Sequence, residues 1–202
     1  MATLLPQAFY AEDAVAVAPR LIGMHLRHGD VVMRITEVEA YPPGDSASHC
    51  RMGRTARNEP MWGPPGHVYV YLCYGIHMML NVTTNAMGEG AAVLIRGCEP
   101  IAGLDTVLER RGGQASRLRL DGPGKVGAAL ALDRSFSGQP LYQEGGLTLE
   151  QGSAPSSGLL YGARVGIDFA KARDVKAKLR FAAANSPHVS RRKELKPLPR
   201  RS

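Results

Sequence analysis

Three polar side chains alternate along one apolar stretch, the segment RITEVEAY that spans Arg34–Tyr41. Glu37, Glu39 and Tyr41 are spaced two residues apart, so in a regular β-strand all three point to one face of the sheet. A carboxyl group that is partly buried beside another has a raised pKa, which suits a general base. The pattern therefore indicates a candidate catalytic carboxylate. The alternative is a solvent-facing edge strand on which the glutamates have no chemical role.

A second unusual stretch is HVYVYLCYGIHMMLNVTT, His67–Thr84. Two β-like runs are joined around Tyr74-Gly75-Ile76, which predicts a hairpin with an aromatic ring at its tip. Hairpin tips normally carry Gly, Asn or Asp, so this ring calls for a specific explanation. Tyr69 and Tyr71 share one face of the first run, where they either pack in the core or form a stacking slot for a flat ring. Asn81 on the return strand is either a satisfied core amide or a hydrogen-bonding selector.

Arg96 ends the apolar run AAVLIRG. Because burying an unpaired arginine is costly, Arg96 needs a carboxylate partner on another strand, or it serves as an electrostatic clamp in a site. The turn GPGK, Gly122–Lys125, lacks the spacing of a nucleotide-binding P-loop. We expect it to hold, at most, a backbone phosphate of DNA.

The elements that position these residues are predicted from periodicity and turn residues. The spacing predicts a helix over Ala11–Leu21, and then a hairpin that turns at HGD and leads into the strand Val31–Tyr41. The hairpin around Tyr74 and a strand over Ala91–Gly97 come next. Two more helices are predicted, one within Ile101–Gly113 and one after the GPGK turn. The polar, basic connection Pro42–Gly66 is so long that it is either disordered or functional. These elements predict an α+β fold: one mixed domain over residues 1–202, built around a curved antiparallel sheet with a protruding β-hairpin and surrounding helices.

The charge of the chain points to a polyanionic partner. The 202 residues carry a formal charge of +7, and residues 171–202 hold 11 lysines and arginines against two acidic residues. Nucleic acid is the first expected partner and an anionic membrane the second. We expect residues from about 190 to 202 to form a flexible basic tail. The three cysteines fit no zinc or redox motif, and the N-terminus does not read as a signal peptide. We expect a cytoplasmic protein, nucleoid-associated in a bacterium, with reduced thiols and no metal or cofactor.

Taken in order, the segments EVEAY, SHCRMGRTARN, GPPGHVYVYLCYGIHMMLNV, AAVLIRGCEP, GPGKVGAALALD and ARVGI resemble the alkyladenine (3-methyladenine) DNA glycosylase family, in its compact bacterial form. The resemblance covers roughly residues 37–189. It implies a monomeric, monofunctional glycosylase of base excision repair, with no obligate protein partner and no lyase activity. Such an enzyme flips a damaged purine out of duplex DNA and hydrolyses its N-glycosidic bond. The damaged purines it implies are 3-methyladenine and, more broadly, hypoxanthine, ethenoadenine and 7-methylguanine.

The resemblance also implies roles for individual residues. Glu39 would activate the water that attacks C1′, with Arg96 and the backbone carbonyl of Val165 helping to hold that water. Residues around the flipped base would be Tyr41, His49 and Tyr71, with Asn81 placed to disfavour normal guanine. Tyr74 would enter the minor groove and fill the vacated position in the base stack. Further residues at the DNA would be Ile76, His77, Arg54, Arg57, Lys125 and Arg134.

Two other functions are compatible with parts of this pattern. A non-catalytic module that binds distorted DNA would explain the charge and the exposed tyrosine, but it leaves Glu39 without a role. A carboxylate-pair hydrolase of small glycosides would explain EVEAY, but not the charge of +7.

Overall fold

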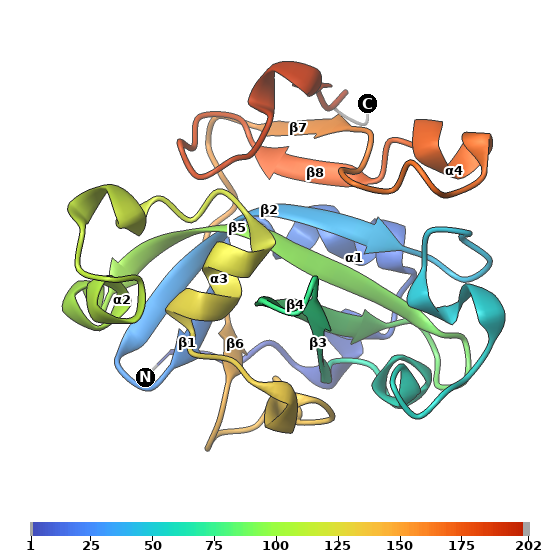
Figure 1. Ribbon diagram of the computed structural model, residues 1–202, viewed down its shortest axis with the longest axis horizontal. Coiled ribbons are helices and arrows are strands. Elements are labelled where there is room, and N and C mark those ends of the chain that lie inside the picture. The colour runs from blue at the N-terminus through green and yellow to red at the C-terminus, as the bar shows by residue number, and fades with distance from the viewer. Residues whose placement is uncertain (1, 200–202) are drawn as a thin grey trace.

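The computed structural model describes residues 2–199 and shows one antiparallel sheet with helices around it (Figure 1). The strands are β1 (His25–His28), β2 (Val31–Tyr41), β3 (Val68–Cys73), β4 (His77–Thr84), β5 (Ala91–Ala102), β6 (Thr148–Glu150), β7 (Leu159–Gly162), β8 (Arg180–Ala183) and β9 (Lys196–Pro197). The α-helices are α1 (Ala14–Leu21), α2 (Leu104–Arg110), α3 (Pro123–Ala129) and α4 (Ala172–Lys176). Short 3-10 helices are η1 (Gln7–Tyr10), η2 (His49–Met52), η3 (Glu59–Trp62), η4 (Ala115–Leu118), η5 (Arg134–Phe136) and η6 (Arg192–Glu194). The predicted α+β class is confirmed.

Strand β2 lies inside the sheet and organises it. Along one edge β2 pairs with β5. Along its other edge β2 pairs first with β1, over Val31–Arg34, and then with β8, over Glu37–Glu39. The path of the sheet runs β3-β4-β5-β2-β8-β7-β9, and β1 and β6 form a side branch. Both glutamates of EVEAY therefore occupy an interior strand. The alternative of a solvent-facing edge strand is wrong.

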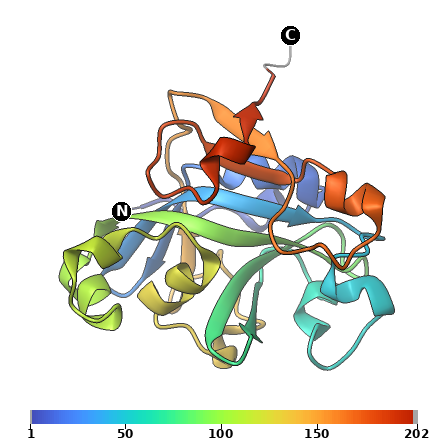
Figure 2. The same ribbon diagram turned by 45° about the horizontal axis from the view of Figure 1, so that its top comes forward.

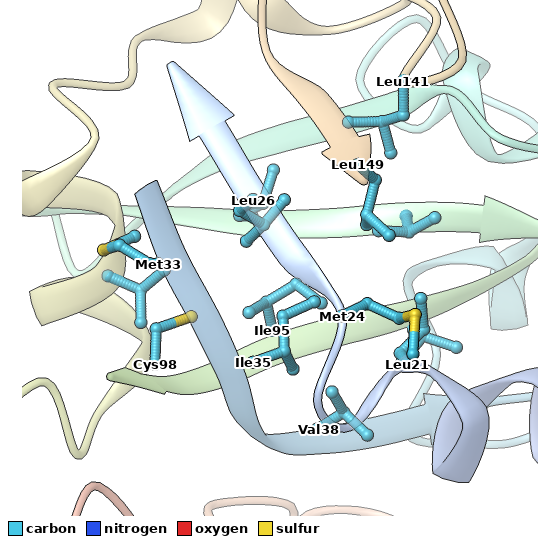
Figure 3. Close-up of a cluster of buried hydrophobic side chains, with 14 of the residues drawn as sticks. Leu21, Met24, Leu26, Met33, Ile35, Val38, Ile95, Cys98, Leu141 and Leu149 are labelled. Carbon is cyan, nitrogen blue, oxygen red and sulfur yellow. The ribbon is translucent and has the colours of Figure 1, made fainter. Parts of the chain in front are cut away.

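The hydrophobic core joins the sheet to helices α1, α2 and α3 and to the segment from Leu120 to Leu149, and Figure 3 shows part of it. Ile35 and Val38 of β2 and Ile95 of β5 have no exposed surface, and Leu21 of α1 packs in the same cluster. Helix α1 begins at Ala14 rather than at Ala11, because the carboxylate of Asp13 accepts a hydrogen bond from the Val15 amide and caps the helix.

Helix α3 packs directly on β4 and β5 (Figure 1), and its contacts with β4 include Met78, close to the turn of the hairpin. Its Gly127 permits this approach, since a Cβ there would lie 2.1 Å from the Met78 carbonyl oxygen. The helix predicted within Ile101–Gly113 is present as α2, but Ile101 still belongs to β5. No helix within residues 2–199 has the length and apolar character needed to cross a membrane.

Strands β3 and β4 form the predicted hairpin, which projects from the body of the molecule (Figure 2). Cys73 pairs with His77, so Tyr74, Gly75 and Ile76 make the turn. Tyr74 and Gly75 both have positive φ, 50° and 73°. A tyrosine in this conformation is strained, and strained residues cluster at functional sites, so Tyr74 is a candidate functional residue.

The long connection Pro42–Gly66 has a fixed structure that contains η2 and η3. Asn58, which is buried, organises it: the side-chain amide donates to the carbonyls of His49 and Gly53, at 2.9 Å each. Its oxygen accepts hydrogen bonds from the Thr55 amide at 2.7 Å and the Trp62 indole at 3.2 Å. Of the two interpretations of this segment, disorder is therefore excluded.

The C-terminal segment belongs to the fold up to the last residue described. Strand β9 pairs with β7, and the Leu198 amide donates to the Leu159 carbonyl at 2.8 Å. Glu194 forms an ion pair with Arg180, a fully buried residue of β8. The expectation of a flexible tail beginning near residue 190 is therefore wrong for residues 190–198, whereas residues 200–202 of the expected tail lie outside the described residues. The charge pattern gave no sign of these partners, which lie far away in the sequence.

Candidate active site

A cavity of about 540 Å³ opens beside the hairpin. Its walls come from β2, β3, β4 and β5, from the connection Pro42–Gly66, and from the loop 163–170. Most of the residues that the sequence marked as a site meet here. They are Tyr41, His49, Tyr71, Asn81, Arg96 and Val165, with Arg57 and Tyr74 also in the lining.

Glu39 lies directly behind this lining and has no exposed surface. Its Oε1 accepts a hydrogen bond from the Val165 amide at 2.7 Å, and its Oε2 accepts one from the Tyr41 hydroxyl at 2.9 Å. Arg96 approaches Oε1 with Nη1 at 3.4 Å. The resemblance implied that the Val165 carbonyl helps to hold the water, and the structure adds a direct contact between the Val165 amide and Glu39.

The surroundings of Glu39 act on its pKa in opposite directions. Burial raises the pKa, because a carboxylate loses its hydration, and the nearby Glu37 raises it further. Arg96, the Val165 amide and the Tyr41 hydroxyl lower it. Burial is the largest effect, so the pKa of Glu39 is raised above its ordinary value, which gives a carboxylate that is more basic than an exposed one.

Arg96 joins the two glutamates of EVEAY. Its Nε lies 3.3 Å from Glu37 Oε1, and its Nη1 reaches Glu39 across the β2–β5 pairing. The expected carboxylate partner on another strand is thus confirmed, and there are two of them. All three side chains are buried, so the charges interact through protein rather than through water.

Aromatic rings build one wall of the cavity. The His49 and Tyr71 rings are in contact, with centroids 4.3 Å apart, and the Tyr69 ring lies 5.7 Å from Tyr71. Tyr69 also holds His49, since its hydroxyl is 2.8 Å from His49 Nδ1. Burial, with help from Arg57 and a second arginine, lowers the pKa of His49 to about 4. His49 is therefore a neutral ring at neutral pH.

Asn81 lies on β4, paired with Tyr69 on one side and Leu94 on the other. Its side-chain nitrogen donates to the Tyr69 carbonyl at 3.1 Å and to the Met79 carbonyl at 3.4 Å. These two acceptors fix which end of the amide is the nitrogen. The amide oxygen accepts no hydrogen bond from the described residues, and Asn81 belongs to the cavity lining.

Four of the other residues expected at the DNA lie on the hairpin and on the neighbouring helix α3. Tyr74 and Ile76 project from the hairpin tip with 89% and 73% of their surface exposed. The segment GPGK, predicted as a turn that precedes a helix, is itself the start of α3, with Gly122 as the N-cap and Pro123 as the first helical residue. The His77 ring lies against Gly124 of α3, where a Cβ would meet it at 2.6 Å. Lys125 of α3 forms an ion pair with Asp121 at 2.5 Å.

The basic residues of the expected DNA surface differ in their surroundings. Arg57 has its guanidinium 5.6 Å from the centre of the Tyr71 ring, at the cavity. Arg54 forms an exposed ion pair with Glu59. Arg134 is exposed on η5 and is not part of the cavity lining. The structure thus brings Arg57 to the candidate site but leaves Arg134 apart from it.

Two residues that the sequence reasoning did not select also shape the site. Arg164 is buried, pairs with Asp45, and places its guanidinium 4.7 Å from the centre of the Tyr41 ring. Phe169 is 65% exposed at the cavity mouth. Arg164 directly precedes Val165 in ARVGI, a segment that carried the resemblance, but periodicity gave no sign that an arginine in a loop would be buried.

The site combines a buried glutamate, an aromatic wall and an exposed ring on a hairpin, as expected for an enzyme that acts on a base of DNA. Comparison with known proteins agrees with this class. Residues 8–187 match the family model described as methylpurine-DNA glycosylase. The chain belongs to this family, and it is a DNA glycosylase of DNA repair.

Named relatives cover nearly the whole chain. A protein of Nitrosococcus oceani, provisionally named a 3-methyladenine DNA glycosylase, is 54% identical over 198 residues, which is 98% of each chain. The DNA-3-methyladenine glycosylase of Arabidopsis thaliana is 52% identical over 197 residues, covering 96% of this chain and 78% of the plant protein.

Proposed function

We propose that this protein excises alkylated or deaminated purines from duplex DNA by hydrolysis of the N-glycosidic bond, with a water molecule activated by Glu39. The observation that carries the proposal is the position of Glu39: a fully buried carboxylate with a raised pKa, directly behind an aromatic cavity. Carboxylates of this kind serve as general bases. The family and the names of the relatives support the same substrate class.

The hydrogen bonds of Glu39 leave room for a water molecule. Oε2 accepts only the Tyr41 hydroxyl among the described residues, and a carboxylate oxygen can accept two hydrogen bonds. Because Glu39 has no exposed surface, water would reach it between Tyr41, Arg96 and Val165, which do line the cavity. The water would give a proton to Glu39 as it attacks C1′, and the purine would leave with the bonding electrons. The product would be an abasic site.

The aromatic wall suits the base that has to leave the helix. His49 and Tyr71 are too close for a base to lie between them, with centroids 4.3 Å apart, so we place the base between this pair and Tyr41. Stacked aromatic contacts of this kind are worth about 1–3 kcal/mol per base. A cationic base such as 3-methyladenine would gain further attraction from the tyrosine faces. The neutral state of His49 avoids repulsion of that cation.

Asn81 would select among purines. Its side-chain amide, held by the Tyr69 and Met79 carbonyls, stands in the cavity wall, where it would clash sterically with the exocyclic amine of guanine. A normal guanine would then bind poorly, whereas adenine derivatives and hypoxanthine lack that amine and would enter. 7-Methylguanine carries the same amine, so its release would depend on the weaker glycosidic bond of this cationic base.

The hairpin would hold the duplex open. Tyr74 is almost fully exposed in a strained conformation, so it contributes little to folding and is available to DNA. An inserted ring would fill the gap that the flipped nucleotide leaves and offset the unstacking cost of a few kcal/mol. Ile76 and His77 would contact the groove beside it. Arg54, Arg57, Lys125 and Arg134 would contact phosphates.

The experiment that tests this function uses duplexes with one lesion each: hypoxanthine, ethenoadenine, 3-methyladenine or 7-methylguanine. The protein is incubated with each duplex and with an undamaged duplex, and hot alkali then cleaves any abasic site. Strand breaks at the lesion alone are the expected result. Binding to the lesion duplexes without any break would contradict the proposal and favour a non-catalytic module for distorted DNA. Breaks before alkali treatment would contradict the absence of lyase activity.

A further inference from the structure

Glu37 is a buried charge that the proposed chemistry does not use. It has no exposed surface, yet its two oxygens face four hydrogen-bond donors. Oε1 accepts from Arg96 Nε at 3.3 Å, Arg180 Nη1 at 3.2 Å and the Ser190 hydroxyl at 2.8 Å, and Oε2 accepts from the Ser190 amide at 2.7 Å. A carboxylate bound this fully is held in one place.

Arg96 is shared between this carboxylate and the candidate base. Its Nε faces Glu37, its Nη1 faces Glu39, and its Nη2 lies 3.4 Å from the Ser190 hydroxyl. A planar guanidinium held at two of its nitrogens has little freedom to turn. Glu37 and Ser190 therefore determine where Arg96 places its remaining nitrogen against Glu39.

Arg180 connects the same carboxylate to the loop on the other side of Glu39. Its Nε donates to the Ala163 carbonyl at 2.8 Å, two residues before Val165, whose amide contacts Glu39. Its Nη1 also donates to the Ser190 carbonyl at 3.1 Å, and its Nη2 reaches Glu194 at 3.1 Å. One buried arginine thus ties Glu37, the Val165 loop and the C-terminal segment together.

We propose that Glu37 is a positioning residue of the active site: it holds Arg96 against Glu39 and shares its charge, while Arg180 and Ser190 hold Glu37 in place. The inference rests on the proposed function, in which Glu39 is the base. It gives the ordered residues 190–199 a part in the reaction, although they do not line the cavity in the described structure.

The charges around Glu39 determine the direction in which its pKa should move when the charge of Glu37 is removed. The groups that face Glu39 are Arg96 from β5, Glu37 and Tyr41 from β2, and the Val165 amide, with Tyr71 of β3 beyond them. With Glu37 ionised, the positive charge of Arg96 is divided between two carboxylates. If Glu37 becomes neutral, Arg96 acts on Glu39 alone, the ionised form of Glu39 is favoured, and its pKa falls.

The test is the pH dependence of single-turnover excision by Glu37→Gln, on whichever lesion the parent protein releases fastest. We expect the midpoint of the acidic limb to move down by about one pH unit, the size of effect that one nearby charge has on a carboxyl group. A folded variant with the parent's midpoint would overturn the inference. The control is Glu12→Gln, which removes one partner of the exposed Glu12–Arg20 ion pair and should leave the profile unchanged.

A second variant decides the matter if Glu37→Gln does not fold. Ser190→Ala removes the hydroxyl between Glu37 and Arg96 but keeps the backbone hydrogen bond to Glu37. We expect the excision rate to fall about tenfold with unchanged affinity for the lesion duplex, because only the alignment of Arg96 is lost. A rate within about twofold of the parent would overturn the inference. If the parent itself releases no base, the proposed function is overturned. If the parent is active and the variants behave as the parent does, only the inference about Glu37 is overturned.

Discussion

The exposed tyrosine at the hairpin tip allows folding and function to be separated. Tyr74 is 89% exposed and has φ of 50°. Replacing an exposed side chain that packs against little changes stability by at most about 0.5 kcal/mol. Tyr74→Ala should therefore unfold at the same denaturant concentration as the parent. Tyr74→Gly should be at least as stable as Tyr74→Ala, because glycine adopts positive φ without the steric cost of a Cβ.

The same change should be costly in the complex with DNA. Loss of one base-stacking ring costs about 1–3 kcal/mol, which corresponds to a roughly 5- to 150-fold weaker affinity for a lesion duplex. The assay is equilibrium binding to a hypoxanthine duplex, with Glu39→Gln in both proteins so that the lesion is not consumed. Product release should become faster in the variant that keeps Glu39, because the ring no longer holds the abasic site.

A matched control separates this effect from general loss of apolar surface. Met87 is 72% exposed in the turn between β4 and β5 and is not part of the cavity lining. Met87→Ala should change neither stability nor binding. Unfolding of Tyr74→Ala at a clearly lower denaturant concentration than the parent would refute the prediction, and so would an unchanged affinity for the lesion duplex.

Two further predictions follow from the site. The pKa of Glu39 in the folded protein is raised above 4.5, so folded Glu39 holds its proton more tightly than Glu39 in the unfolded chain. Ionisation of Glu39 therefore lowers the free energy of unfolding as the pH rises from about 4.5 through the folded-state pKa. The free energy of unfolding of Glu39→Gln relative to the parent should therefore increase with pH over this window, by about 1.4 kcal/mol for each pH unit that separates the folded and unfolded pKa values. Urea titrations at several pH values measure this difference, and a difference that does not change with pH would contradict the prediction. Asn81→Ala should release normal guanine from undamaged duplex at least about tenfold faster than the parent, and an unchanged rate would exclude Asn81 as the selector.

Local sequence pattern was a good guide to the strands of the site. The alternation in EVEAY placed Glu37 and Glu39 together, and both do meet Arg96. The hairpin with Tyr74 in its turn also agrees with the pattern, because turn residues and alternation act over a few positions. The pattern alone favoured packing of this ring against a neighbouring loop, and its exposure follows the resemblance instead. Residues close together in the sequence determine these features, so each can be predicted from a short segment alone.

What supports these residues from a distance was not predictable in this way. Ser190 lies 153 residues from Glu37, and Arg180 lies 143 residues from it. The basic composition of the last segment indicated a solvated tail, although its Glu194 and Ser190 are both bound to buried groups. Arg164 behind Tyr41 was missed for the same reason. An ion pair between two residues that are far apart in the sequence produces no periodic pattern in the segment of either residue.

The measurement that tests the central claim most directly compares Glu39→Gln with the parent in two assays on the same lesion duplex. Glutamine keeps the size of the side chain and one acceptor oxygen but cannot take a proton from water. We predict that excision in single turnover falls by about 10²- to 10⁴-fold, the usual contribution of a general base, while affinity for the duplex stays within a few-fold of the parent. Base release at the parent rate by Glu39→Gln would contradict the account.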